Sequence, residues 1–399
     1  MKSTGIVVGA GIVGSAVAYE LARRGVSDLQ VLDIDLQGEW SSTERNAGGV
    51  RHLWMNRVNM DLARCSIGLF SEIGDKIGFA RKGYLWLFSK ENSGDGEATF
   101  ERARKNNLEY EKLSVADIRN RYPFIDKTDD LAFALFGPRD GLINSNALKQ
   151  YYRDQARAKG VTFHDRVWVE KVQDSASGVE IQGVQVESTS AATGLLQQPA
   201  KAAGKNMQWK ADFVVLCAGA WMHHLLRGLV DQPMVEPIRR QISFFKADDL
   251  DLAEYGMIVD TSRVYFHAEG GNVLAGFVIK DEKPGYRFDY DRDFFESNIW
   301  PALFERSSKF ERLREVSGWG GLYSYTPDTS GLLGWIPGSE RILEAHSFTG
   351  RGVMQSYGAA VAVADLVLER KFTHLDAAGL TRERFREPKA TWLFEGLHI

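Results

Sequence analysis

The spacing of hydrophobic positions changes twice before Asp33, from a continuous apolar run to a helical repeat and back to a continuous run. A continuous apolar run at 6–8 predicts a short buried strand. Apolar residues at Val13, Val17 and Leu21 then recur on one helical face, and this pattern stops at Gly25. A second apolar run at 29–32 predicts another strand, which ends at Asp33. The N-terminus therefore predicts a strand, an amphipathic helix and a second strand.

The rest of the chain alternates between helical and strand-like patterns. A segment rich in Ser, Ala and Gly at 188–205 has no packing pattern, and we expect a mobile hairpin loop there. The patterns predict helices at 146–160 and 358–369, strands at 167–169, 240–245 and 264–266, and a strand-sized apolar segment at 213–221.

Length and composition narrow the class of protein. A chain of 399 residues is too long for one comfortable core, so we expect two domains. The net charge of −4 argues against a broad nucleic-acid-binding surface or a polybasic membrane face. No run approaches the ~20 apolar residues of a membrane span, so no stable membrane insertion is expected.

The two cysteines, Cys65 and Cys217, form no CxxC motif and no metal-ligand spacing. We expect no metal site and no disulfide framework. A cytoplasmic location fits this usage best, although a cysteine-poor periplasmic protein has the same appearance. Lys2 and the apolar run at 5–18 also resemble a short secretory signal, but the four glycines within this run favour a strand and turn.

The residues 9–14 have the pattern G-x-G-x-x-G between the first strand and the helix. Gly9 permits a tight turn, Gly11 lets the backbone approach a pyrophosphate, and Gly14 lets helix and strand pack closely. The helix begins around Ile12 and Val13, where free N–H groups present partial positive charge to phosphates.

Asp33 lies 19 positions after Gly14, near the ~20 expected for a carboxylate that accepts bonds from ribose hydroxyls. Asp35 is the alternative ligand, but we expect it to lie past the strand end in solvent. The strand, helix and terminal acid around the glycines make dinucleotide binding a strong prediction. The spacing alone does not distinguish FAD from NAD.

Four landmarks, in order along the chain, select the cofactor. They are the polar stretch at 41–52, the strand and Ala218-Gly219-Ala220-Trp221, the stretch 319–328, and Ser347-Phe348-Thr349-Gly350-Arg351-Gly352 with the helix after it. Together they resemble the D-amino-acid oxidase and sarcosine oxidase (DAO) superfamily of FAD-dependent oxidoreductases.

The resemblance implies an α/β protein with two domains. A Rossmann-like FAD-binding domain of the glutathione-reductase/DAO type is expected at 1–85, 145–235 and 325–399. A substrate or cap domain with a mostly antiparallel sheet is expected at 86–144 and 236–324. Residues beyond the glycine cradle that the resemblance assigns to FAD are Ser41, Ser42, Arg45, Asn46, Ala47, Gly48, Gly49, Val169, Ala218, Gly219, Trp221, Gly350, Arg351, Gly352, Val353 and Met354.

The same resemblance gives candidates for the substrate side. Arg51 matches the arginine that holds the substrate carboxylate in sarcosine oxidases, through a planar fork of two bonds. Met354 stands where those enzymes place a second carboxylate-binding lysine, so that contact is missing. Arg351 stands near the pyrimidine end of the flavin, where a cation raises the redox potential. The remaining pocket candidates are His52, Tyr265, His267, Tyr323 and Tyr325. Tyr323 occupies the place of the carboxylate-binding arginine of D-amino-acid oxidases, which argues against that subgroup.

Departures from the family bear on flavin attachment and on the electron acceptor. The covalent attachment sites of some relatives align near Gly321 and Arg45, so we expect non-covalent FAD. The lysine that helps oxygen react in sarcosine oxidases aligns near Leu274, and Lys280 is out of register. This favours a dehydrogenase over an oxidase, with an unknown acceptor.

The leading hypothesis is an FAD-dependent oxidoreductase that takes a hydride from the C–N bond of an amino acid or amine, most readily an N-substituted amino acid. The imine product then hydrolyses. One alternative is a 2-hydroxy-acid dehydrogenase, because Arg45-Asn46-Ala47-Gly48 resembles the RNSG of that branch, although Arg51 replaces its histidine. Another is an FAD-bound scaffold or assembly factor.

Overall fold

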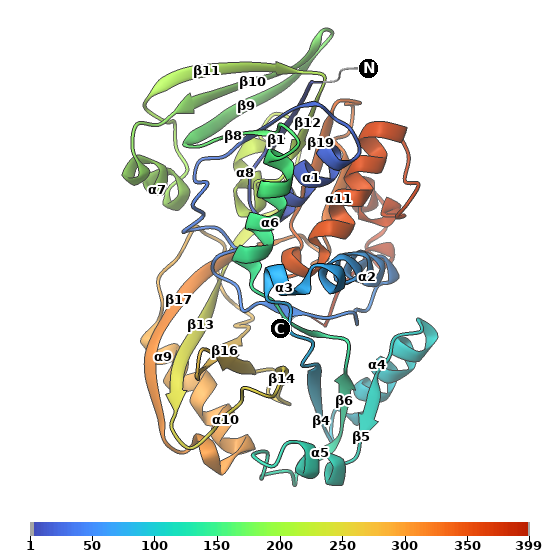
Figure 1. The fold of residues 1–399 in the computed structure, drawn as a ribbon, viewed down its shortest axis with the longest axis vertical. Coiled ribbons are helices and arrows are strands. Elements are labelled where there is room, and N and C mark those ends of the chain that lie inside the picture. Colours follow the sequence, from blue (N-terminus) through green and yellow to red (C-terminus); the bar gives the residue numbers. More distant parts are fainter. Residues whose placement is uncertain (1–3, 398–399) are drawn as a thin grey trace.

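The computed structural model describes residues 4–397 and has two sheet-centred halves, one above the other in Figure 1. The upper half is built on a six-stranded sheet. Its strand order is β18 (Leu332–Trp335), β19 (Ile342–His346), β12 (Phe213–Leu216), β1 (Thr4–Val8), β2 (Asp28–Leu32) and β8 (Thr162–His164). All neighbours are parallel except β18 and β19.

Both faces of this sheet are covered, which explains the continuous apolar runs of its strands. Val7 packs among helices on one face, while Ile6 and Val8 pack on the other face against strands. The helices are α1 (Ile12–Arg23), α2 (Arg57–Glu72), α3 (Gly74–Ile77), α6 (Ser145–Arg157) and α11 (Gly352–Glu369). The covering strands are β9 (Val167–Ser175), β10 (Gly178–Gln185) and β11 (Lys205–Ala211).

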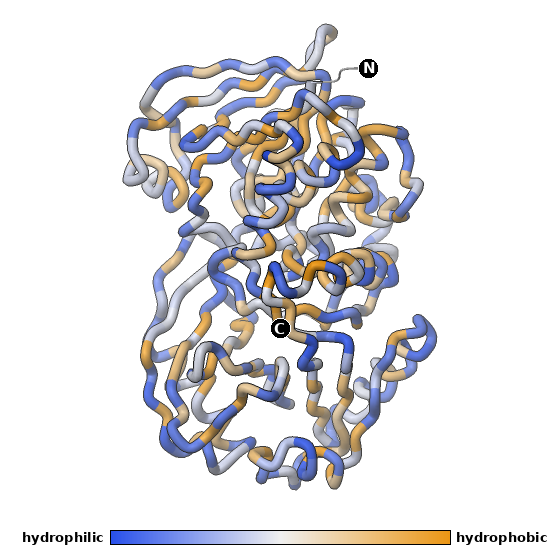
Figure 2. Tube along the Cα trace, viewed as in Figure 1, coloured by the Kyte–Doolittle hydropathy of each residue, from blue (hydrophilic) through white to orange (hydrophobic). Residues whose placement is uncertain are grey.

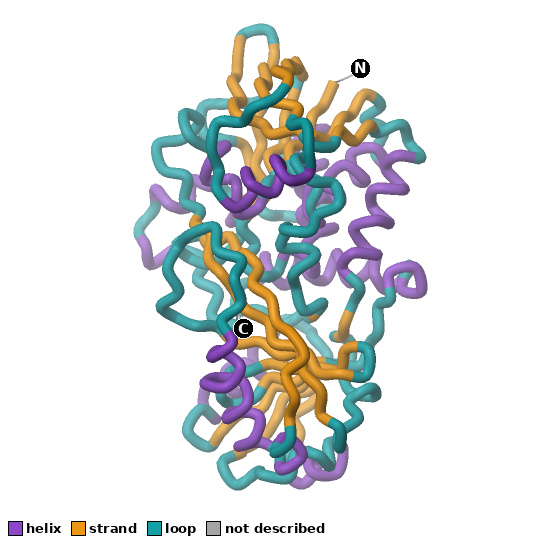
Figure 3. Tube along the Cα trace, turned by 90° about the vertical axis from the view of Figure 1, so that its left-hand side faces the viewer, coloured by secondary structure: helices purple, strands orange, loops and turns teal. Residues whose placement is uncertain are grey.

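The lower half contains an eight-stranded sheet (Figure 3). Its strand order is β17 (Leu313–Tyr325), β13 (Glu236–Ala247), β16 (Asn272–Phe277), β15 (Tyr265–Glu269), β14 (Met257–Val259), β4 (Tyr84–Ser89), β6 (Leu131–Gly137) and β5 (Glu111–Leu113). Only the β4–β14 pair is parallel. The small ribbon of β3 (Gly49–Val50) and β7 (Gly141–Leu142) lies outside this sheet.

The period-two pattern of β15 gives the lower sheet two different faces. Phe266 packs with residues of α5 (Val115–Arg121), α9 (Arg292–Phe294) and α10 (Trp300–Arg306). Tyr265 packs on the opposite face, in a cluster that Ala47 of the 41–52 stretch contacts. This second face therefore looks toward the upper half. The remaining helices are α4 (Ser93–Lys105), α7 (Thr189–Gln197) and α8 (Met222–Leu225).

The predicted α/β architecture with a largely antiparallel second sheet is confirmed, as are the two N-terminal strands and the helix between them. The exact domain boundaries stay a prediction. β4 begins at Tyr84, just inside the range that we predicted for the FAD-binding domain. Among residues 4–397, no helix combines the length and apolar character needed to cross a bilayer. Figure 2 shows hydrophobic positions recurring in the central strands and helices, and hydrophilic ones along the outer loops.

The prediction of a mobile hairpin loop at 188–205 is wrong, because half of this segment is the helix α7. Ser188 caps the helix by accepting a bond from the Ala191 N–H at 3.2 Å. Ala192 and Leu195 are buried against Trp168. The capping serine and this apolar i, i+3 pair are the sequence signals of a helix, but the surrounding small residues obscure them.

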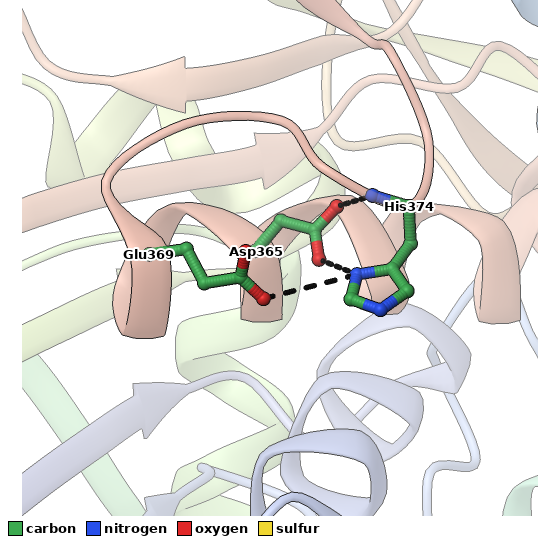
Figure 4. A group of neighbouring side chains, drawn as sticks. All are labelled: Asp365, Glu369 and His374. Atoms are coloured by element: carbon green, nitrogen blue, oxygen red, sulfur yellow. Dashed lines mark hydrogen bonds and ion pairs between the residues drawn. The ribbon is translucent and has the colours of Figure 1, made fainter.

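The C-terminal end of α11 is fixed by Asp365 (Figure 4). Its carboxylate accepts bonds from the N–H groups of Thr373 and His374, at 2.9 and 2.7 Å, and from the His374 ring at 2.7 Å. It also pairs with Arg24 of α1 at 2.7 Å. Asp365, Glu369 and His374 have ligand atoms within 4.8 Å of one another. Because Arg24 already neutralises Asp365, we interpret this group as stabilising the turn that follows α11.

Candidate functional site

A cavity with a volume of about 1330 Å³, its open mouth included, lies at the carboxyl ends of β1, β2 and β12. This is the edge of a parallel sheet where α/β proteins bind ligands. The predicted cofactor residues that line it are Gly9, Gly11, Ile12, Val13, Asp33, Ser41, Ser42, Asn46, Val169, Ala218, Gly219, Trp221, Gly350, Gly352 and Val353. Of the predicted substrate residues, Tyr323 also lines it.

The three glycines of the N-terminal motif have different surroundings. Gly9 has φ +98°, and a Cβ there would lie 2.6 Å from the Cys217 carbonyl oxygen. A Cβ on Gly14 would lie 1.8 Å from the Gly9 oxygen, so helix and turn touch here. A Cβ on Gly11 would meet only the Thr43 hydroxyl, at 3.7 Å, and it would project toward the cavity. This cradle therefore fits a pyrophosphate at the N-terminus of α1.

The two acidic ribose candidates lie together. Asp33 accepts bonds from the N–H of Ala10, in the glycine turn, and from the N–H of Asp35 at 2.7 Å. Burial raises the pKa of the Asp33 carboxyl, and these two bonds oppose the rise. The expectation that Asp35 lies in solvent is wrong, since it is half-buried and lines the same cavity.

Arg153, which the sequence analysis missed, braces the glycine turn from α6. It donates to the Ala10 carbonyl, to the Leu36 carbonyl at 2.6 Å and to the Ser15 hydroxyl at 3.1 Å. The sequence feature that could have indicated Arg153 is a pair of basic residues four positions apart, Lys149 and Arg153, beside the apolar face of a predicted helix. Both side chains are buried, so the pair is not on a solvated helix face; Arg153 lines the cavity, and Lys149 pairs with Glu44.

The stretch 41–52 is held by side chains that bond to main chain. Thr43 accepts a bond from the Ile12 N–H at 3.1 Å, and Ser42 donates to the Leu322 carbonyl. Asn46 accepts from the Gly48 N–H and from the Ser145 hydroxyl at 2.9 Å. These bonds fix the polar stretch between the glycine cradle and β17. The predicted cofactor residues that do not line the cavity are Gly14, Arg45, Ala47, Gly48, Gly49, Arg351 and Met354.

The loop before α11 has an unusual backbone. Ser347, Thr349 and Gly350 have φ values of +58°, +45° and +78°. Positive φ is uncommon for residues other than glycine and is concentrated at functional sites. A Cβ on Gly350 would lie 2.5 Å from the Tyr323 ring, so only glycine fits against this aromatic wall of the cavity.

Arg51 lies outside the cavity lining and is 2% exposed. Its guanidinium stacks on Trp54, at 3.5 Å from the ring centre, and lies 4.7 Å from the Trp86 ring. The Nη atoms donate to the carbonyls of Leu53, at 2.8 Å, and Leu397. Burial lowers the pKa of Arg51. The C-terminal segment thus reaches the arginine that the resemblance assigns to the substrate carboxylate.

Two histidines predicted for the pocket are tied to neighbours. His52 bonds through Nδ1 to Asp140 at 2.7 Å, and Tyr110 donates to the same carboxylate. Both ring nitrogens of His267 face carbonyl oxygens, Ala268 at 2.8 Å and Ala47 at 2.9 Å. His267 therefore links β15 to the 41–52 stretch.

Tyrosines and a further arginine surround the end of β17. The rings of Tyr323 and Tyr325 stack with their centres 6.3 Å apart. Arg240, which the sequence analysis did not name as a candidate, donates to the Tyr325 hydroxyl at 2.6 Å. Tyr265 is buried nearby, and burial raises its pKa well above the ordinary value while Arg240 opposes the rise.

Arg351 is 1% exposed and lies 5.1 Å from the ring centre of Trp54, the ring that Arg51 contacts. Its Nη2 donates to the Thr329 carbonyl, while Nε and Nη1 are buried without a hydrogen-bond partner among residues 4–397. Burial lowers the pKa of Arg351 to about 10, although Glu395 nearby opposes the fall.

Comparisons with known proteins agree with this geometry. The family model described as FAD dependent oxidoreductase (DAO) matches residues 6–366. The FAD-dependent oxidoreductase domain-containing protein 1 of Xenopus laevis is 26% identical over 412 residues, covering 95% of this chain and 82% of the relative. A monomeric sarcosine oxidase of Bacillus sp. (strain B-0618) is 26% identical over 390 residues, covering 92% of this chain and 93% of the relative.

A solved L-proline dehydrogenase from P. horikoshii has a TM-score of 0.83 at 20% identity and covers 96% of this chain and 98% of its own. At this identity the likeness shows a shared fold. The family match extends over both halves of the molecule, from β1 into α11. The chain therefore belongs to the DAO family of FAD dependent oxidoreductases.

Proposed function

We propose that this chain oxidises the C–N bond of an amino acid, most readily an N-substituted one, with non-covalent FAD in the cavity. FAD, when bound, supplies the acceptor for the substrate hydride. Two features support this cofactor. The open space at Gly11 fits a pyrophosphate, and the carboxylates of Asp33 and Asp35 line the same cavity, where a ribose could bind. The imine product hydrolyses without help from the protein.

The observation that carries the substrate class is the environment of Arg51. Its guanidinium is buried on Trp54, and its Nη atoms donate to main-chain carbonyls, which carry no full negative charge. Each Nη retains a second N–H, which is a charged donor for a substrate carboxylate. Removed from water, such a pairing is stronger than at the surface. The name of the sarcosine oxidase relative is consistent with an N-methyl amino acid as substrate.

A 2-hydroxy acid is the second candidate, and the His52–Asp140 pair favours it. Oxidation of an alcohol needs a base for the hydroxyl proton, and a carboxylate-oriented imidazole is suited to that role. A deprotonated amine needs no such base, so amine oxidation should accelerate as pH rises. Anaerobic bleaching of the flavin by N-methyl amino acids, D-amino acids and 2-hydroxy acids decides between the candidates. A flavin that none of them reduces would support an FAD-bound scaffold instead.

The proposal also concerns the electron acceptor, which is either oxygen or another molecule. Leu274, which stands where sarcosine oxidases have the oxygen-activating lysine, is buried in an apolar cluster, and Lys280 is exposed. We therefore favour a dehydrogenase. Reduced enzyme should transfer electrons to an artificial dye much faster than to oxygen, and rapid hydrogen peroxide formation in air would refute this preference.

Non-covalent attachment has its own test. Gly321 offers no side chain at one attachment position of the family, and Arg45 occupies the other, where it donates to the Gly320 carbonyl at 2.7 Å. Acid or heat should therefore release FAD into the supernatant. Yellow precipitated protein and a colourless supernatant would contradict the proposal.

A further inference from the structure

Two buried arginines lie on one aromatic side chain behind the cavity wall. Arg51 and Arg351 stand 3.5 and 5.1 Å from the ring centre of Trp54. Burial raises the pKa of Tyr323, and the charges of Arg351 and Arg51 oppose the rise, so both lie close to this residue. Tyr323 lines the cavity. Gly350, the chain neighbour of Arg351, also lines the cavity and packs on the Tyr323 ring, so the arginine pair lies beside this wall of the cavity.

The hydrogen-bonding state of Arg351 is unusual for a buried cation. Nε and Nη1 have no partner in the described part of the chain. Leaving a charged donor buried and unpaired is unfavourable, so such groups ordinarily have a partner. Arg351 also caps the N-terminus of the 18-residue helix α11, whose partial positive charge adds to its own. Both features favour an anion at this position.

The carboxylates near the pair, among the described residues, are Glu395, Asp328 and Asp140. Glu395 is the carboxylate that influences both Arg51 and Arg351. Asp328, near Arg351, already pairs with another arginine at 2.7 Å, and Asp140, near Arg51, bonds to a histidine at 2.7 Å. Within residues 4–397, Glu395 is therefore the carboxylate neighbour that the two guanidinium groups have in common.

We propose that the substrate is an amino acid with two carboxylates, one held by Arg51 and the other by Arg351. This inference rests on the proposed function, because it assumes that Arg51 holds the carboxylate of the amine that is oxidised. It assigns to Arg351 the selection of a dianionic substrate. Arg351 supplies Nε and Nη1, two charged donors without a partner among residues 4–397, and either of them can form a charge-assisted bond to a carboxylate oxygen.

The test compares two unreactive ligands in the FAD-loaded enzyme. Thiodiacetate carries two carboxylates on a thioether, which replaces the oxidisable amine, and its monoamide has nearly the same shape with one carboxylate. Dissociation constants come from the change in flavin absorbance. We expect thiodiacetate to bind about tenfold or more tightly than the monoamide, as one charge-assisted contact predicts. Arg351→Gln should remove this preference, and Arg351→Lys should keep part of it.

Arg104→Gln changes an arginine whose side chain is 65% exposed and serves as the control that keeps the preference. Equal affinities of the two ligands in the wild-type enzyme overturn the inference, and this comparison needs no variant. A preference that survives Arg351→Gln also overturns it. If Arg351→Gln lowers the flavin midpoint potential and leaves the ratio of the two dissociation constants unchanged, Arg351 acts on the cofactor and the inference is overturned. Arg51→Gln should weaken the binding of both ligands. If it does not, the proposed function is contradicted, whatever the result for Arg351.

Discussion

Replacing Gly11 by valine should remove FAD binding and leave the fold intact. Gly11 has φ −62° and ψ −174°, which valine adopts without strain, and a Cβ there meets no protein atom closer than 3.7 Å. The added methyl groups project toward the cavity and obstruct the approach of a pyrophosphate to the N-terminus of α1. Losing two N–H bonds to phosphate costs about 3–6 kcal/mol, or roughly a hundredfold to ten-thousandfold in Kd.

The assay has two parts, because affinity and folding must be separated. Apo-protein is titrated with FAD by quenching of flavin fluorescence, and its thermal unfolding is followed without FAD. Gly68→Val is the matched control, since Gly68 lies in α2 with no atom within 4 Å of a new Cβ. Gly14→Ala should unfold the protein, because its Cβ would lie 1.8 Å from the Gly9 oxygen. Full FAD affinity in Gly11→Val would show that the cradle is misplaced.

Three further predictions follow from the site and the fold. Asp33→Ala should weaken FAD by about 1–3 kcal/mol in the same titration, and a larger loss in Asp35→Ala would show that the other carboxylate holds the ribose. Arg51→Ala should lower kcat/KM on the amino acid by about a hundredfold or more with unchanged flavin content, and Arg51→Lys should recover only part; loss of FAD instead would make Arg51 a cofactor ligand. Burial alone would raise the pKa of Asp365, but its bonds to Arg24 and His374 lower it to about 2, so its stabilisation is present at neutral pH and lost as pH falls from about 4 to 2. Asp365→Asn should therefore lower the free energy of unfolding at pH 7 by about 2–3 kcal/mol in urea denaturation, and a deficit that persists at pH 2 would refute this assignment.

The N-terminal half of the cofactor site could be predicted because its signals are local. Gly9, Gly11, Gly14 and Asp33 lie within one strand–helix–strand unit, where spacing alone fixes geometry. The alternation in β15 likewise indicates a two-sided strand. Local patterns do not show which face meets the cofactor half, because that depends on the contact of Ala47 with this sheet.

The residues that were missed depend on contacts between distant segments. Arg153 bonds to Ala10 and Leu36, more than a hundred positions away. Arg240 bonds to Tyr325 across the β13–β17 pair, and nothing in the sequence near Arg240 marks that register. Polar residues on apolar helix faces are the usable signal for such cases, as with Arg153.

The end of the chain shows why the substrate side is harder to predict than the cofactor side. The carboxylate of Glu395 accepts bonds from the Met55 N–H at 3.0 Å and from Asn59 at 3.1 Å, which holds the C-terminal segment against the start of α2. That anchoring brings the Leu397 carbonyl to Arg51. A buried guanidinium needs acceptors to offset its lost hydration, and here the chain supplies them from its far end. The orientation of Arg51 is therefore a property of the completed fold, whereas the phosphate cradle is formed by a single turn.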